Sequence, residues 1–101
     1  MAQFDVYING NSSTNAIFPY LLDIQNDLHN LLYSRLVVPL SINSKPIKHL
    51  TPQFTIEDKK VIMSTMDMAS VSKSILNKKV CNLSEFRSEI IDAVDFLING
   101  F

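Results

Sequence analysis

The apolar residues of this chain change their spacing once, and that change constrains the fold more than any other feature. In residues 3–8 polar and apolar side chains alternate, so that Phe4, Val6 and Ile8 share one face, as in a half-buried strand. In residues 86–98 the apolar side chains recur every three or four positions, as on one side of a helix. Strands followed by a single amphipathic helix predict an α+β fold built on an antiparallel sheet.

Four more apolar stretches have the length of strands, namely residues 17–24, 36–40, 53–56 and 61–66. The last two flank the charged run of residues 57–60, a pattern that predicts a hairpin with a charged turn. Short apolar pieces around Val71 and Ile75 predict one more small strand pair. Residues 41–52 are polar and contain two prolines, so we expect a loop with at most a helical turn.

The ends of the predicted helix are marked by residues that satisfy free backbone groups. Asn82 or Ser84 is suited to accept hydrogen bonds from the first free amides. Asn99 and Gly100 mark the other end, because glycine readily takes the left-handed conformation that closes a helix.

Composition and charge exclude several function classes. The chain has 101 residues, which predicts a single domain over residues 1–101 whose small core would gain stability from a dimer. Its net charge is −1, so it lacks the basic excess of a protein that grips nucleic acid directly. A lone cysteine, no membrane-length apolar segment and no signal-like start predict a cytoplasmic protein without a membrane role.

Residues able to carry catalysis or to hold a metal are few and scattered. His29 and His49 lack metal-ligand spacing, and Cys81 lies apart from both in the sequence. The only glycines, Gly10 and Gly100, cannot form a phosphate-binding loop. We therefore predict a binding protein that is not an enzyme and has neither a cofactor nor a metal.

Four side chains have both a structural and a functional interpretation. Asp23 and Asp27 are expected to be solvated or capping carboxylates rather than a catalytic pair. Arg35 is expected in a structural ion pair, the alternative being a phosphate contact. Cys81 is expected to be buried and unreactive, although a position before a helix favours a thiolate.

Several segments, taken in order, resemble the CcdB family. They are Gln3-Phe4-Asp5-Val6-Tyr7, Leu22-Asp23-Ile24-Gln25-Asn26-Asp27-Leu28, Arg35-Leu36-Val37-Val38-Pro39-Leu40, Met66-Asp67-Met68-Ala69-Ser70-Val71, Leu83-Ser84 with Arg87 and Ile90, and the tail from Asp95 to Phe101. The resemblance covers nearly the whole chain, with gaps mainly in the loops of residues 9–16 and 41–52.

The resemblance implies both a fold and an activity. The fold is a small barrel-like antiparallel sheet of SH3-like topology, with a minor three-stranded sheet and a C-terminal helix, in a homodimer. CcdB-type toxins bind the A subunit of DNA gyrase and trap the enzyme after it has cut DNA. The resemblance thus implies a toxin of a type II toxin–antitoxin system that meets DNA only through gyrase or through its antitoxin.

The resemblance also assigns the contact with gyrase to two regions. The gyrase-binding set that it implies is Asn26, Leu28, Asp95, Asn99, Gly100 and Phe101. The family's tail has a large aromatic residue, glycine and an aliphatic residue, whereas this chain has Asn99, Gly100 and Phe101. An aromatic anchor is thus lost at one position and gained at another, which bears on the strength of binding.

An antitoxin is implied as the second partner. Relatives bind an acidic, largely disordered tail of a CcdA-type antitoxin, which folds on contact. Part of that site lies along the first loop, and the residues it would use here are Asn9, Gly10, Asn11 and Ser12.

Two alternatives to a gyrase poison stay open. One is a messenger-RNA endonuclease, as in toxins that share this fold, in which Arg35 with a nearby acid or serine would carry the cleavage. The other is a homologue that no longer poisons gyrase and still binds antitoxin, which the change at Asn99 suggests.

Overall fold

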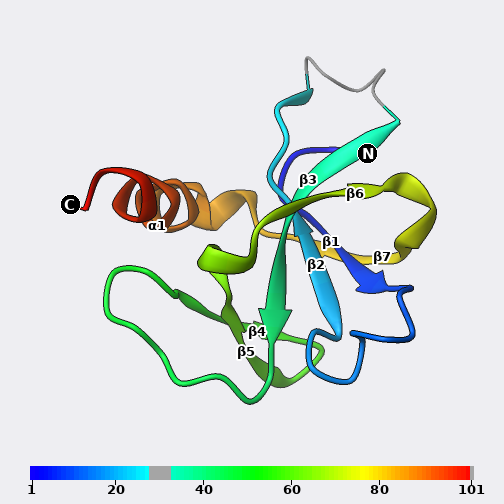
Figure 1. The fold of residues 1–101 in the computed structure, drawn as a ribbon, viewed down its shortest axis with the longest axis horizontal. Helices are drawn as coiled ribbons and strands as arrows, with labels where there is room; N and C mark the ends of the chain where they lie inside the picture. The colour runs from blue at the N-terminus through cyan, green and yellow to red at the C-terminus, as the bar shows by residue number, and fades with distance from the viewer. Residues whose placement is uncertain (28–32, 101) are drawn as a thin grey trace.

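Within residues 1–27 and 33–100, which the computed structural model describes, the chain forms seven strands and one α-helix (Figure 1). The strands are β1 (Asp5–Asn9), β2 (Tyr20–Asp23), β3 (Ser34–Ser41), β4 (Gln53–Ile56), β5 (Lys59–Met63), β6 (Ala69–Ser72) and β7 (Leu76–Asn82), and the helix is α1 (Arg87–Asn99). Short 3₁₀ turns are η2 (Thr65–Asp67), η3 (Lys73–Ile75) and η4 (Ser84–Phe86). The predicted α+β fold is confirmed.

The sheet is antiparallel throughout and runs in the order β4-β5-β3-β2-β1-β7, with β6 also pairing with β3. The long strand β3 belongs to two groups of strands. Most of its length pairs with β2 and β6, while Leu40 and Ser41 at its end pair with β5. The strands β6, β3, β2, β1 and β7 form the barrel-like part. The hairpin β4–β5 and the end of β3 form the minor three-stranded part, as predicted.

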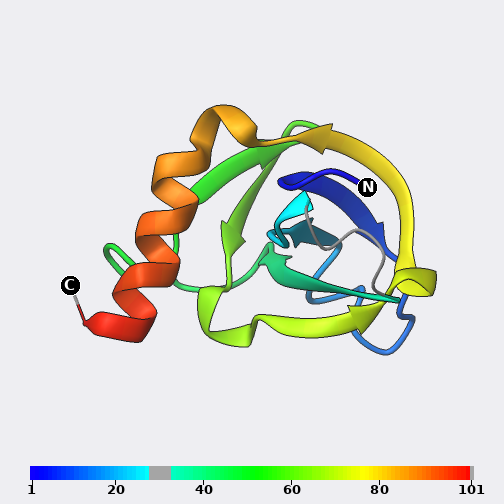
Figure 2. The ribbon, with the colours of Figure 1, turned by 90° about the horizontal axis from the view of Figure 1, so that it is seen from above.

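The two faces of the curled sheet bury two separate cores. Alternate residues of the central strands, such as Val6, Leu22 and Val38, pack into the larger core together with Ile90 and Ala93 of α1. The other face carries a smaller core of Tyr7, Leu21, Val37 and Leu76. Figure 2 shows β6 and β7 wrapping round the curled sheet and meeting at η3, while α1 lies on the opposite side.

The hairpin β4–β5 turns through two residues rather than through the four charged residues that were expected. Glu57 and Asp58 both have positive φ, 50° and 65°, while Lys59 and Lys60 already belong to β5. Two consecutive left-handed residues are the mark of a type I′ turn, whose twist matches that of the flanking strands. The Glu57 carboxylate also accepts a hydrogen bond from the Tyr20 hydroxyl at 2.6 Å, which ties the turn to β2.

The strand β7 is the element that the sequence pattern indicates least well. The predicted small strand pair around Val71 and Ile75 is observed as β6 and β7, but these strands pair with β3 and β1 and not with each other. Ile75 itself lies in η3, and β7 continues to Asn82. Its exposed residues Asn77, Lys78 and Lys79 follow one another and hide the alternation, as charged residues on an edge strand often do.

The helix α1 begins and ends close to the predicted positions. The Asn82 side chain accepts a hydrogen bond from the Ser84 amide at 2.8 Å in the turn before η4, but the N-cap residue of α1 is Phe86, so neither Asn82 nor Ser84 caps α1 as expected. At the other end Gly100 has φ 78°, and its amide bonds to the Phe96 carbonyl at 2.8 Å. The expected left-handed glycine at the end of the helix is therefore present. Among the described residues no helix is long and apolar enough to cross a membrane.

The hairpin turn provides a test of this backbone assignment. The substitution Asp58→Gly is expected to raise the free energy of unfolding by about 0.5 kcal/mol, because glycine takes positive φ without steric cost. Asp58→Ala is the matched control and is expected to lower it. Urea unfolding of both variants measures the difference, and a glycine variant no more stable than the alanine variant would contradict the assignment.

Candidate functional site

The C-terminal end of α1 presents apolar side chains to solvent. Ile90 and Ala93 fix the helix to the core, whereas Leu97 is 38% exposed and Ile98 is 70% exposed one turn further on. Apart from its chain neighbours, nothing lies within 4 Å of the position that a Cβ of Gly100 would occupy, so a side chain at this point would enter open space. An exposed branched aliphatic side chain next to a left-handed glycine makes this end suited to contact another molecule.

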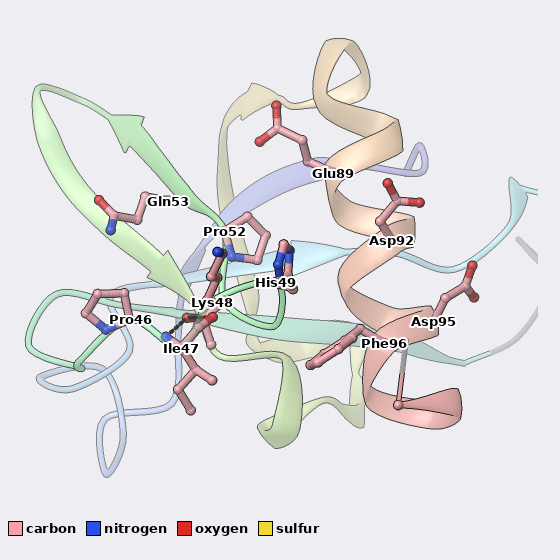
Figure 3. Close-up of a pocket in the computed structure, with 12 residues that line it drawn as sticks. Pro46, Ile47, Lys48, His49, Pro52, Gln53, Glu89, Asp92, Asp95 and Phe96 are labelled. Carbon is pink, nitrogen blue, oxygen red and sulfur yellow. Dashed lines mark hydrogen bonds between the residues drawn. The ribbon is translucent and has the colours of Figure 1, made fainter.

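A groove of about 880 Å³ runs along α1 from Glu89 to Gly100 (Figure 3). Its residues come from two segments, the loop of residues 46–53 and the helix. They are Pro46, Ile47, Lys48, His49, Thr51, Pro52 and Gln53 from the loop, and Glu89, Asp92, Asp95, Phe96 and Gly100 at the helix. Figure 3 shows Glu89 and Phe96 extending from α1 towards the loop, with Asp92 and Asp95 following along the same helix.

The wall of the groove that faces α1 is held in shape by side chains. Residues 47–51 form the expected turn, in which Thr51 Oγ1 accepts from the Ile47 amide at 2.6 Å and donates to the Ile47 carbonyl at 3.1 Å. Thr65 of η2, which is fully buried, donates its hydroxyl hydrogen bond to the Leu50 carbonyl. The loop is thus held by hydrogen bonds within its own turn and by one hydrogen bond to η2.

The residues that the resemblance assigns to gyrase lie in two separate places. Asp95, Asn99 and Gly100 are exposed on the last turns of α1, whereas Asn26 is exposed near the other end of the helix. The position of Asn26 follows from two hydrogen bonds that connect its neighbour Asp27 to the start of α1. The Asp27 carboxylate accepts from the Gln3 amide at 2.7 Å, and the Gln3 side chain accepts from Arg87 at 3.2 Å. Arg87 begins the 13-residue helix, so about 18 Å of helix separates it from Asn99.

The two remaining residues of the gyrase-binding set, Leu28 and Phe101, lie outside the described residues, as does His29. Within one subunit the structure therefore brings together only Asp95, Asn99 and Gly100 from the set. The sequence resemblance missed the exposed Ile98 beside them. The sequence pattern carries no signal for Ile98, because the apolar spacing of residues 86–98 places it on the predicted apolar side of the helix, and only the structure shows that it is 70% exposed.

The residues assigned to the antitoxin form the first part of the loop after β1. Ser12 and Gly10 are exposed and Asn11 is half-buried, but Asn9 is buried with 3% exposure. The Asn9 side-chain nitrogen Nδ2 donates to Thr14 Oγ1 at 3.0 Å and to the Phe18 carbonyl at 2.9 Å. Asn9 thus shapes the loop from inside, and Asn11 and Ser12 are the side chains that face outwards.

Arg35 and Asp23 form an ion pair at 2.8 Å in which both side chains are 0% exposed. Arg35 also donates to the Gln25 carbonyl at 3.3 Å, and Asp23 accepts from the Gln25 amide at 3.0 Å. Burial raises the pKa of Asp23, and the hydrogen bond from Arg35 limits that rise. The structural ion pair expected for Arg35 is confirmed, but the expectation of a solvated Asp23 is wrong, since only Asp27 is exposed.

A second buried carboxylate lies near this pair, and the sequence pattern alone does not reveal it. Asp5 is 2% exposed and accepts hydrogen bonds from Asn82 at 2.9 Å, from the Ala2 amide at 2.9 Å and from the Tyr7 hydroxyl at 3.1 Å. Burial works against its charged form, yet these bonds and Lys79 at 3.2 Å together lower the pKa of Asp5. Burial and the negative charge of Asp5 raise the pKa of Tyr7 to about 12.

The other candidate residues show no catalytic arrangement among the described parts of the chain. No three potential metal ligands gather there. Cys81 is half-buried rather than fully buried as expected, and burial raises the pKa of its thiol, which disfavours the thiolate. The exposed His49 packs against Phe96 of α1, with ring centroids 6.0 Å apart, so that it contributes to the groove.

The model of the family described as CcdB protein matches residues 3–100. The chain belongs to the CcdB family. The match includes the end of α1 and Gly100, and the family resemblance seen in the sequence is confirmed. Membership supports the broader expectation of a toxin from a toxin–antitoxin system, and the gyrase target is taken up as a proposal below.

Solved structures with a similar fold carry another activity in their descriptions. An endoribonuclease in complex with its cognate antitoxin from a mycobacterial species matches with a TM-score of 0.77 and 14% identity, covering 97% of this chain and 94% of the other. The Mycobacterium tuberculosis toxin MazF-mt6 matches with a TM-score of 0.77 and 9% identity, covering 94% and 96%. A MazE–MazF structure from Deinococcus radiodurans matches with a TM-score of 0.66 and 13% identity, covering 97% and 93%.

These structures establish the fold, and they correct one expectation. The prediction that this CcdB-family chain is not an enzyme is contradicted, because the same fold is found in endoribonucleases. That prediction rested on the absence of known catalytic motifs from the sequence. A ribonuclease site assembled from ordinary polar residues on a curled sheet leaves no such motif.

The buried ion pair provides a test of what stabilises the CcdB-family frame. Arg35→Met is expected to lower the free energy of unfolding by about 3–5 kcal/mol, because it leaves the Asp23 carboxylate buried without its partner. The double variant Arg35→Met/Asp23→Leu is expected to lose much less. Urea unfolding measures both, with the exposed Arg87→Met as a control. A loss for Arg35→Met no larger than that for Arg87→Met would contradict the role of the pair.

Alkaline pH tests the buried tyrosines. The pKa values of Tyr7 and Tyr20 are both raised from 10.0 to about 12, chiefly by burial. Their stabilising contribution is complete below pH 10, where the unfolded chain also keeps both protons, and is lost as the pH rises towards 12. Each tyrosine is expected to cost about 1 kcal/mol between pH 10 and 11. Urea unfolding of wild type and Tyr7→Phe at both pH values measures this loss. An equal loss of the free energy of unfolding between pH 10 and 11 in the two proteins would contradict it.

Proposed function

We propose that this CcdB-family chain, as a single domain over residues 1–101, is a toxin that binds the A subunit of DNA gyrase and traps gyrase on cleaved DNA. One observation carries the proposal. The family match extends through residue 100, to the exposed end of α1 where Ile98, Asn99 and Gly100 are presented to solvent. A helix end that is anchored at one side and exposed at the other is a preformed contact surface.

Trapping requires that the toxin bind one state of gyrase better than the others. A ligand shifts an equilibrium only by its difference in affinity between states, so the tail must fit the cleaved state in particular. The apolar side chain of Ile98, which is 70% exposed, offers surface that gains free energy when it is buried. Asn99 and Asp95 supply polar contacts beside it, and Gly100 sets the direction in which the chain leaves the helix.

A homodimer is part of this proposal. Asn26 lies near the start of α1, so one subunit cannot place it beside Asn99 of the same subunit. A second copy related by two-fold symmetry provides a way to bring Asn26 of one subunit close to the helix end of the other. Such a dimer also matches the symmetry of a dimeric target.

A CcdA-type antitoxin is proposed as the neutralising partner, in the cytoplasm where gyrase acts on DNA. The outward-facing residues Asn11 and Ser12 are its proposed contacts on the first loop. Asn9 and Gly10 are proposed to act indirectly in that site. A side chain at Gly10 would meet the Ile75 carbonyl at 2.9 Å, so the loop approaches η3 closely there.

Ribonuclease activity is the second candidate, and the fold shared with endoribonucleases favours it. In this chain Arg35 is fully buried against Asp23, so it is not the group that would meet an RNA phosphate. Cleavage would have to use other polar residues on the surface of the sheet. A homologue that keeps its antitoxin and has lost gyrase poisoning is the third candidate, since Asn99 replaces an aromatic anchor.

The deciding experiment scores purified gyrase for trapped, cleaved DNA in the presence of the full chain. A truncation that lacks Asn99, Gly100 and Phe101 is the test variant, and Ile98→Asp is a second variant that keeps the chain length. We expect cleaved complexes with the full chain and a loss of at least about tenfold in potency with either variant, because the truncation removes the proposed contacts of the tail and Ile98→Asp places a charge where an apolar side chain would be covered. Ile62→Val, a conservative change away from the helix end, is the control.

The same protein samples are incubated with a long messenger RNA. Cleaved gyrase–DNA complexes without RNA cleavage would support the gyrase proposal, and RNA cleavage without gyrase trapping would replace it by the second candidate. Binding of the antitoxin with neither activity would favour the third.

A further inference from the structure

The groove between the loop of residues 46–53 and α1 has an apolar part that the proposed gyrase contact does not use, and an acidic part that shares Asp95 with that contact. Its apolar part is formed by Phe96 with the His49 ring against it, and by Ile47, which is 47% exposed (Figure 3). Pro46 and Pro52 add further apolar surface without a backbone donor. A polar partner alone would leave this surface in contact with water.

The acidic part follows the helix. Glu89, Asp92 and Asp95 are spaced three residues apart and line the groove as a row that turns around α1, from Glu89, which extends towards the loop, to Asp95, which extends away from it (Figure 3). Among the residues that the structure describes, none of the three takes part in an ion pair. Residues 84–99 carry four acidic side chains and one basic side chain, while the whole chain carries a net charge of only −1. Negative charge is therefore concentrated at this groove.

We propose that this groove binds a segment of a partner protein that carries lysine or arginine side chains next to apolar ones. The basic side chains would meet the row of carboxylates, and the apolar ones would cover Phe96 and Ile47. A volume of about 880 Å³ suits a short piece of polypeptide. The same carboxylates repel nucleic acid phosphates and acidic segments, so the acidic antitoxin tail expected from the family is not the occupant.

The wall of the groove is already formed, which lowers the cost of binding. Thr51 fixes the turn of residues 47–51, and Thr65 bonds to the Leu50 carbonyl, so the loop does not have to be ordered by the partner. Lys48 is the basic exception on this wall, and it forms no ion pair with the three carboxylates. Of the side chains that the inference uses, only Asp95 belongs to the proposed gyrase contact, and the test variant leaves Asp95 unchanged.

The test uses the full chain and two synthetic probes. One is a hexapeptide that alternates lysine pairs with leucine, and the other is the same peptide with every lysine replaced by glutamate. Two-dimensional NMR of the labelled chain follows the amide shifts during titration. We expect the lysine peptide to shift the amides of residues 47–51, 53 and 89–96 in a saturable manner, and the glutamate peptide to leave them unchanged. Binding should weaken as salt is added.

The variant Glu89→Gln/Asp92→Asn removes two carboxylates of the row and leaves Asp95 and the tail in place. Its affinity for the lysine peptide is expected to fall about fivefold, as for the loss of two exposed charge contacts. Asp58→Asn/Asp67→Asn removes the same net charge elsewhere and is the matched control, expected to bind as the wild type does. Its spectrum and that of the test variant also report whether each protein is folded.

Two results would overturn the inference. One is an absence of saturable shifts in the groove with the lysine peptide. The other is an equal loss of affinity in the test and control variants, which would mean that net charge and not the groove attracts the peptide. Gyrase trapping by the test variant is scored separately, so a failure of this inference is distinguishable from a failure of the gyrase proposal.

Discussion

The buried ion pair between Arg35 and Asp23 is the contact on which the rest of the sheet depends. Both side chains are 0% exposed, and an isolated charge in that position would cost several kcal/mol, so the two must meet. They lie on neighbouring strands, where Asp23 pairs with Val37 across the ladder. A slip of one residue between β2 and β3 would turn one partner to the other face. The backbone carbonyl of Asp23 also accepts from the Phe4 amide at 2.6 Å, so the same residue sets where β1 begins.

Around this sheet, some surface elements are anchored by buried side chains and others are exposed to solvent. The curled sheet fixes one side of α1 through Ile90 and Ala93, and η2 holds the loop of residues 46–53 through Thr65. Beyond Ala93 the apolar side chains of α1 are progressively less covered, and Ile98 stands largely in solvent. The result is a fixed helix with an open end and an acidic groove beside it. Both features suit a protein that works by binding other proteins.

The sequence predicted the class of fold because its strongest signals are local. Alternation in β1, the spacing of apolar residues in α1 and Gly100 after it each depend on a few neighbouring residues. The strand β7 was only partly indicated, since Asn77, Lys78 and Lys79 on an edge hide its pattern. The burial of Asp5 and Asp23 was not predicted, because it depends on partners 77 and 12 residues away in the sequence. The groove was not predicted either, since its two walls are brought together only by the tertiary fold.

The central claim is that the exposed end of α1 is the contact with gyrase, and hydrogen exchange tests it most directly. The exchange rates of backbone amides are measured for the full chain alone and with an excess of the gyrase A subunit. If the end of α1 contacts gyrase, the amides of Ile98, Asn99 and Gly100 exchange more slowly in the complex, and exchange along β7 is unchanged. Unchanged exchange at the helix end under conditions where the two proteins bind, or protection confined to another surface, would contradict the claim.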